Sequence, residues 1–196
     1  MTEAEWLACT DPMPMLEFLR DKTSDRKLRL LECGTCRLYR QLLTVENATK
    51  AMEKIEQLID ASATKEQIAL GWKGLWDAGW GNSTSIADVD LAARTAKEWS
   101  AICGYPDTGR PQQSRLVYCI FGNPFRPLIF DSTWLTSNVV GLARAIYDER
   151  VFDRMPILGD ALEDAGCDNQ DILNHCRQGG EHVRGCWVVD LVLGKE

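Results

Sequence analysis

The stretch that decides the fold is Ser24-Asp-Arg-Lys-Leu-Arg-Leu-Leu-Glu-Cys33-Gly-Thr-Cys36-Arg-Leu-Tyr-Arg-Gln-Leu-Leu43. It carries leucines at positions 28, 31, 38 and 42, and these intervals place them on one face of an α-helix. Ser24 stands directly before the pattern, where a helix N-cap is expected. We therefore predict a helix over residues 25–43.

The same helical period recurs along most of the chain. Thr2 with Glu5 and Thr64 with Gln67 match capping boxes, and Asp11-Pro12 is typical of a helix start. Further helices are predicted over residues 46–61, 86–102, 138–149, 153–165, 169–177 and 181–193. No alternation is long enough for a sheet, although residues 116–121 fit either strand or helix. The sequence predicts an all-α globular bundle of roughly eight to ten helices.

A loop-like segment near the middle suggests the internal organisation. Residues 105–115 contain two prolines and one glycine without an apolar period. We expect residues 1–104 to form an N-terminal helical part with a Trp-rich middle, residues 105–115 a linker loop, and residues 116–196 a C-terminal helical part. A chain of 196 residues suits one domain, so both parts are expected to share a core.

Composition excludes several function classes. The net charge of −7 argues against a nucleic-acid partner, because phosphate binding needs a surplus of Lys and Arg. No apolar run is long enough to span a membrane. The acidic start, Met1-Thr-Glu-Ala-Glu-Trp6, lacks the features of a signal peptide and predicts a cytoplasmic protein with reduced thiols. The expected partner is another protein.

The cysteines and the two histidines form two clusters that suggest a metal site. Cys33 and Cys36 lie three residues apart, and His182 and Cys186 lie four apart, so each pair would share a helix face. Zn²⁺ takes four such ligands in a tetrahedron. Because Cys33 and Cys36 fall off the leucine stripe, we predict a zinc site formed by these four residues between the N- and C-terminal helices. Alternative ligands are His175 and Cys176.

Other interpretations of these residues remain open. Cysteine is often simply a small buried side chain, and the long gap between the two pairs favours this interpretation over zinc. The Cys33-Gly-Thr-Cys36 motif also resembles a redox motif, but it lies inside a predicted helix without a preceding strand. A Cys/His nucleophile from the C-terminal cluster lacks a recognisable orienting group.

Several long segments resemble a family of uncharacterised proteins from planctomycete bacteria. They include Phe121-Gly-Asn-Pro-Phe-Arg-Pro127 and His182-Val-Arg-Gly-Cys-Trp-Val-Val-Asp190, and the N-terminal segments Met1–Leu7 and Ser24–Leu30 are similar to the same proteins. The resemblance covers both ends and leaves residues 45–115 as the divergent part. It implies a Cys-rich region around Cys33 and Cys36, and it brings no established activity or cofactor.

The function that follows is a non-enzymatic helical protein-interaction or adaptor module. Its Cys/His clusters would be structural, either simply buried or holding one zinc ion between the N- and C-terminal helices, with no other cofactor. The alternative is a metal- or thiol-dependent enzyme that uses Cys33, Cys36 and the C-terminal His and Cys residues. Access to the cluster distinguishes the two, because catalytic metal sites keep an open coordination position.

Overall fold

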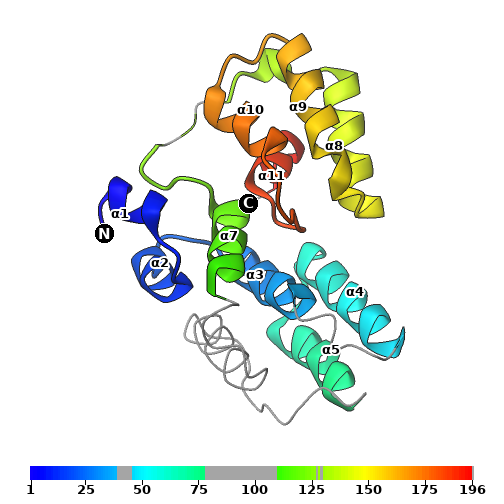
Figure 1. Ribbon diagram of the computed structural model, residues 1–196. Coiled ribbons are helices and arrows are strands. Elements are labelled where there is room, and N and C mark those ends of the chain that lie inside the picture. The colour runs from blue at the N-terminus through cyan, green and yellow to red at the C-terminus, as the bar shows by residue number, and fades with distance from the viewer. Residues whose placement is uncertain (39–45, 78–109, 127, 129, 196) are drawn as a thin grey trace.

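The computed structural model describes residues 1–38, 46–77, 110–126, 128 and 130–195 (Figure 1). This part contains ten α-helices and no β-strand, which confirms the all-α prediction. None of its helices combines the length and apolar character needed to cross a membrane. The helices are α1 (Glu3–Ala8), α2 (Pro12–Leu19), α3 (Asp25–Leu38), α4 (Glu46–Asp60), α5 (Lys65–Asp77), α7 (Arg110–Phe121), α8 (Ser137–Glu149), α9 (Met155–Asp164), α10 (Gln170–Arg177) and α11 (Trp187–Leu193).

Local capping sets several helix starts where the sequence predicts them. The Thr2 hydroxyl accepts from the Glu5 amide at 3.3 Å, and the Glu5 carboxylate accepts from the Thr2 amide at 2.7 Å. Thr64 and Gln67 form the same reciprocal pair at the start of α5. Both predicted capping boxes are confirmed, because each depends only on residues three apart.

The expected linker corresponds only in part to a loop. Residues 110–115 form the first half of α7. Pro111 does not prevent this, because the amide groups of the first helical turn have no partner within the helix and proline is tolerated there. Residues 105–109, the predicted helix over 86–102 and most of the Trp-rich middle lie outside the described residues.

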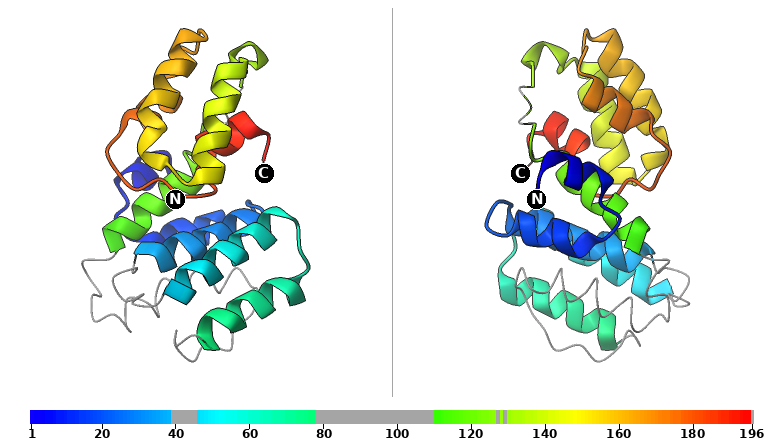
Figure 2. Two further views of the ribbon diagram at one scale, coloured as in Figure 1. Left: turned by 90° about the vertical axis from the view of Figure 1, so that its right-hand side faces the viewer. Right: turned by 60° about the vertical axis from the view of Figure 1, so that its left-hand side comes forward.

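The helices form two hairpins with a central pair between them. Figures 1 and 2 show α4–α5 at one end of the molecule and α8–α9 at the other. Helices α3 and α7 pack side by side between these hairpins, while α11 packs on α8 and α10 on α9. The larger hydrophobic core takes side chains from α1, α2, α3 and every described helix from α7 onward, so segments from both ends of the chain share it.

Helix α3 is buried on two faces. Leu28 and Leu31 point into the larger core. Leu30, Cys33 and Cys36 instead belong to a smaller core with side chains of α4 and α5, namely Met52, Ile55, Ile59 and Ile68. This second face explains why the two thiols lie off the leucine stripe: their apolar neighbours come from α4 and α5.

A network of buried and half-buried charges joins α4 to the C-terminal half. Glu56 and Asp60 lie one turn apart on α4 and face arginines from α3, the end of α8 and the segment before α11. Asp190 on α11 is 1% exposed and pairs with Arg26 at 2.8 Å and Lys27 at 2.6 Å. These pairs fix how α3, α4, α8 and α11 lie against each other, because a buried charge is costly unless its partner stays in place.

Glu32 on α3 makes stability depend on pH. It is 7% exposed, and burial raises its pKa to about 8 although Arg29 opposes the rise. Between the ordinary pKa of 4.5 and about 8, the folded protein keeps a proton that the unfolded chain has lost. The free energy of unfolding should therefore fall as pH rises through this window and level off above it.

We expect Glu32→Gln to remove that part of the pH dependence. Glutamine is neutral at every pH. The free energy of unfolding of the variant, relative to that of the unchanged protein, should therefore be higher at pH 8 than at pH 5 by about 2 kcal/mol or more. Urea unfolding at both pH values measures the gain. Glu17→Gln, at an exposed carboxylate, is the control. An equal stability difference at pH 5 and pH 8 would contradict this role of Glu32.

Candidate metal centre

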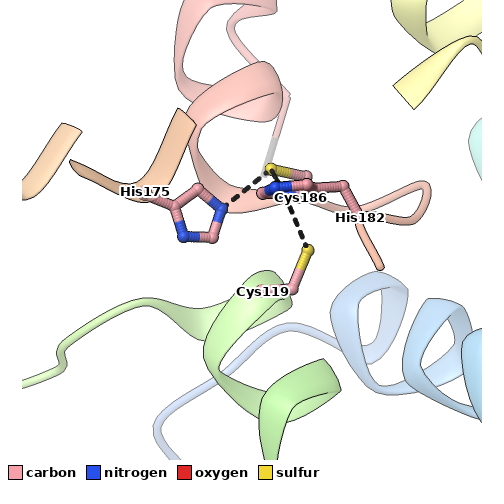
Figure 3. A group of neighbouring side chains, drawn as sticks. All are labelled: Cys119, His175, His182 and Cys186. Carbon is pink, nitrogen blue, oxygen red and sulfur yellow. Dashed lines mark hydrogen bonds between the residues drawn. The ribbon is translucent and has the colours of Figure 1, made fainter. Parts of the chain in front are cut away.

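Four metal-ligating side chains converge where α7, α10 and the start of α11 meet. They are Cys119 on α7, His175 on α10, His182 in the connection between α10 and α11, and Cys186 at the N-cap of α11. Their ligand atoms all lie within 4.8 Å of one another. Figure 3 shows the two imidazoles and the two sulfurs directed toward a common point.

Three of the distances between ligand atoms are close to those of a tetrahedral site. The Nε2 atom of His175 lies 3.3 Å from the Cys186 sulfur. The Nδ1 atom of His182 lies 3.7 Å from the Cys119 sulfur and 3.9 Å from the Cys186 sulfur. In a tetrahedron with Zn–S of about 2.3 Å and Zn–N of about 2.0–2.1 Å, sulfur and nitrogen are about 3.6 Å apart. These three sulfur–nitrogen pairs are therefore spaced close to zinc ligands, within a group whose ligand atoms span at most 4.8 Å.

Packing and backbone turns hold the first two ligands. Cys119 is 2% exposed and lies in the last turn of α7. That helix ends at Gly122, whose φ of +63° turns the chain and whose carbonyl accepts from the Trp6 indole at 3.2 Å. His175 is 6% exposed, and its Nδ1 lies 2.9 Å from the side-chain amide of Gln178. A hydrogen bond to the second ring nitrogen is the usual way to orient a metal-binding histidine.

The segment that carries His182 and Cys186 is not the helix that the sequence predicts. The helical pattern over 181–193 holds only from Trp187 onward, because residues 181–186 form an irregular turn. Gly185 adopts φ +89°, a left-handed conformation that ends helical continuity. His182 and Cys186 therefore meet across a turn rather than along a helix face.

Gly185 should be intolerant of substitution. A Cβ atom there would lie 3.0 Å from Cδ1 and 3.1 Å from Cβ of Leu30, and the positive φ adds strain. We expect Gly185→Ala to lower the free energy of unfolding by about 2 kcal/mol or more, measured by denaturant unfolding. Gly194→Ala is the control, since Gly194 has φ +64° with open space around it and should lose about 1 kcal/mol. Equal losses would show that the contact with Leu30 has no effect.

The surroundings shift the pKa values of the two sulfurs in opposite directions. Burial opposes ionisation of Cys186, but the Cys119 thiol donates a hydrogen bond to it and His175 stabilises its charge, so the pKa of Cys186 falls well below its ordinary value. The same hydrogen bond and burial raise the pKa of Cys119. A bound cation would favour the thiolate form of both sulfurs.

His182 has an unsatisfied nitrogen and lines a cleft. Its Nε2 is buried without a hydrogen-bond partner among the described residues, while its Nδ1 faces the two sulfurs. An ion between the two sulfurs would bind Nδ1, so it would leave Nε2 without a partner. The cleft has a volume of about 560 Å³, and Cys119, His175 and His182 line it together with Arg126 and Trp187.

The structure brings together only part of the predicted ligand set. His182 and Cys186 are neighbours, and the alternative ligand His175 joins them. Cys33 and Cys36 instead lie in the smaller core, outside this group. Cys176 follows His175 on α10 but points toward α9. A Cβ atom added at Gly159 of α9 would lie 2.9 Å from the Cβ atom of Cys176. The fourth ligand atom comes from Cys119.

Sequence reasoning missed Cys119 because nothing in its surroundings marks it. It lies alone in the apolar segment 116–121, far along the chain from both histidines. Only the packing of α7 against α11 brings it to the other three residues.

The Cys33-Gly-Thr-Cys36 motif lies in an environment that disfavours thiol chemistry. Both thiols are 1% exposed and lie within α3. Burial raises the pKa of Cys33 well above its ordinary value. Since the thiolate is the reactive form, this pair has the character of packed side chains.

The comparisons with known proteins add no relative. No protein-family model, curated protein or solved structure matches the chain.

Proposed function

We propose that the protein binds one Zn²⁺ through Cys119, His175, His182 and Cys186, and that the ion has a structural role. The convergence of these four ligand atoms within 4.8 Å is the observation that carries the proposal. Two thiolates with two imidazoles are a set that Zn²⁺ favours, whereas Mg²⁺ and Ca²⁺ prefer oxygen ligands.

A zinc ion at this point would tie together segments that have few other local connections. Its ligands come from α7, α10 and the turn before α11, and α10 and α11 are joined by a connection containing Gly179 and Gly180. Four protein ligands fill a tetrahedral site and leave no position for substrate. This supports a structural site rather than a catalytic one.

A structural site agrees with a role in protein interaction, and we propose another protein as the partner. The support is the presence of large apolar side chains on the surface: Leu70 is 69% exposed, Leu7 56% and Ile157 53%. They lie singly on α5, α1 and α9, and a partner that covered any of them would bury apolar surface.

One observation favours a second candidate, a metal-dependent enzyme. Three of the four proposed ligands line the cleft of about 560 Å³, so a small molecule could approach the ion. In that case one protein ligand, the half-buried His182, would have to leave or the coordination would have to expand.

Metal analysis with cobalt substitution tests the proposal. Protein purified without chelator or histidine tag should contain one zinc per chain by mass spectrometry. Co²⁺ in its place should give the intense visible bands of tetrahedral thiolate coordination, unchanged by added azide. A spectrum that azide alters would support the open site of an enzyme. Protein that takes up neither metal would refute the metal site.

A further inference from the structure

We propose that Cys119 and Cys186 form a redox-active pair: a peroxide oxidises the two sulfurs to a disulfide, and the bound metal ion leaves. The release of metal rests on the zinc site proposed above. The formation of the disulfide rests on the placement of the two sulfurs and can be tested without metal.

The first step of the argument is the proximity of the two sulfurs. Cys119 on α7 and Cys186 at the N-cap of α11 come from segments far apart in the sequence, yet both sulfurs lie beside Nδ1 of His182, at 3.7 and 3.9 Å (Figure 3). Both cysteines are free, and their sulfur atoms belong to a group spanning at most 4.8 Å. A bond between them requires the two sulfurs to approach from at most 4.8 Å to about 2.0 Å.

The second step is access. Cys119 lines the cleft, whereas Cys186 is fully buried behind it and does not line it. A small neutral oxidant such as hydrogen peroxide fits a cleft of about 560 Å³. The smaller core that holds Cys33 and Cys36 contributes no residue to that cleft. The oxidant should therefore reach Cys119 first.

The chemistry balances with peroxide as the oxidant. In the zinc-loaded protein both sulfurs are thiolates. The Cys119 thiolate attacks one peroxide oxygen, the O–O bond breaks, and Cys119 becomes a sulfenic acid while hydroxide takes a proton to form water. The Cys186 thiolate then attacks the Cys119 sulfur and displaces a second hydroxide, which also becomes water. Two thiolates lose two electrons, and one peroxide gains them. The neutral disulfide is a poor ligand, so two imidazoles alone remain to hold the metal.

The third step concerns what the oxidation changes in the fold. The disulfide would keep α7 and the start of α11 joined, so that contact survives the loss of metal. His175 and His182 would lose the metal ion that both of them bind. Between them lie Gly179 and Gly180, both exposed. Among the described residues, none lies within 4 Å of a Cβ atom placed at either position, apart from the chain neighbours. We expect oxidation to loosen residues 178–182 at the edge of the cleft.

Titration of the zinc-loaded full chain with hydrogen peroxide tests the proposal. A chromogenic chelator should report one zinc released per disulfide, and peptide mapping without reduction should find Cys119 joined to Cys186. Excess dithiol and zinc should reverse both changes. Amide hydrogen exchange should rise in residues 178–182 and stay low in α7. The double variant Cys33→Ala/Cys36→Ala should behave like the unchanged protein.

The outcomes separate this inference from the zinc proposal. Zinc that binds but is retained in peroxide, or released with a disulfide between Cys33 and Cys36, would overturn the inference and leave the zinc site standing. If the chain binds no metal, mapping of the metal-free protein still decides: a Cys119–Cys186 disulfide supports the redox pair, and its absence overturns it.

Discussion

Replacing Cys186 with serine is expected to lower the affinity of the protein for Zn²⁺ by about 100-fold or more. Serine keeps the size of the side chain but does not ionise near neutral pH, so one of four ligands is lost. Structural zinc binding is worth about 10–16 kcal/mol, and a quarter of this corresponds to roughly two powers of ten. Cys119→Ser should have the same effect, because both sulfurs belong to the group.

The matched control uses the cysteines that the sequence alone would select. Cys33→Ala/Cys36→Ala removes two thiols from the smaller core and should leave zinc affinity unchanged. Competition with a chelator of known affinity measures all variants, and circular dichroism confirms that each is helical. If the double variant loses zinc while Cys119→Ser keeps it, the ligands are those at positions 33 and 36, and the structural assignment is wrong.

Glu56→Gln is expected to lower the free energy of unfolding by about 3–5 kcal/mol. Glu56 is 1% exposed and contacts three arginines: Arg37 at 2.9 Å, Arg184 at 3.9 Å, and Arg150. Burial, together with the charges of Arg37 and Arg184, lowers the pKa of Arg150 to about 9. Without the carboxylate, these cations would repel each other in a site with little water.

Denaturant unfolding of Glu56→Gln and Glu17→Gln provides the comparison. Glu17 pairs with Arg20 at 2.7 Å, but both side chains are largely exposed. Exposed pairs contribute little, so Glu17→Gln should lose about 0.5 kcal/mol or less. A loss for Glu56→Gln as small as that of the exposed pair would show that the buried network does not stabilise the contact between α4 and the C-terminal half.

Much of the fold could be predicted because its signals are local. The capping boxes at Thr2 and Thr64 and the amphipathic spacing in residues 46–61 depend on residues within two turns of each other. The prediction of a linker was wrong over residues 110–115, since a proline in the first turn of a helix looks the same as one in a loop.

The candidate site was predictable only where its residues are close in the chain. His175, His182 and Cys186 lie within a dozen residues, and their clustering indicated metal binding without showing that a turn at Gly185 joins them. Cys33 and Cys36 carried the stronger motif but belong to the second core face of α3. A cysteine that is simply buried and a cysteine that binds a metal cannot be told apart from the sequence alone.

By itself, then, the sequence determined the helical class and most helix starts, because these follow from spacing along one segment. It also offered His182 and Cys186 as candidate ligands, with His175 as an alternative. The tertiary structure alone decided that Cys119 completes the group and that Cys33 and Cys36 do not. It also decided that Glu56 and Asp60 gather arginines from three separate segments. Which residues meet in these groups depends on how whole helices pack against each other. The packing that forms has the lowest free energy for all contacts together, so it cannot be deduced from any one segment.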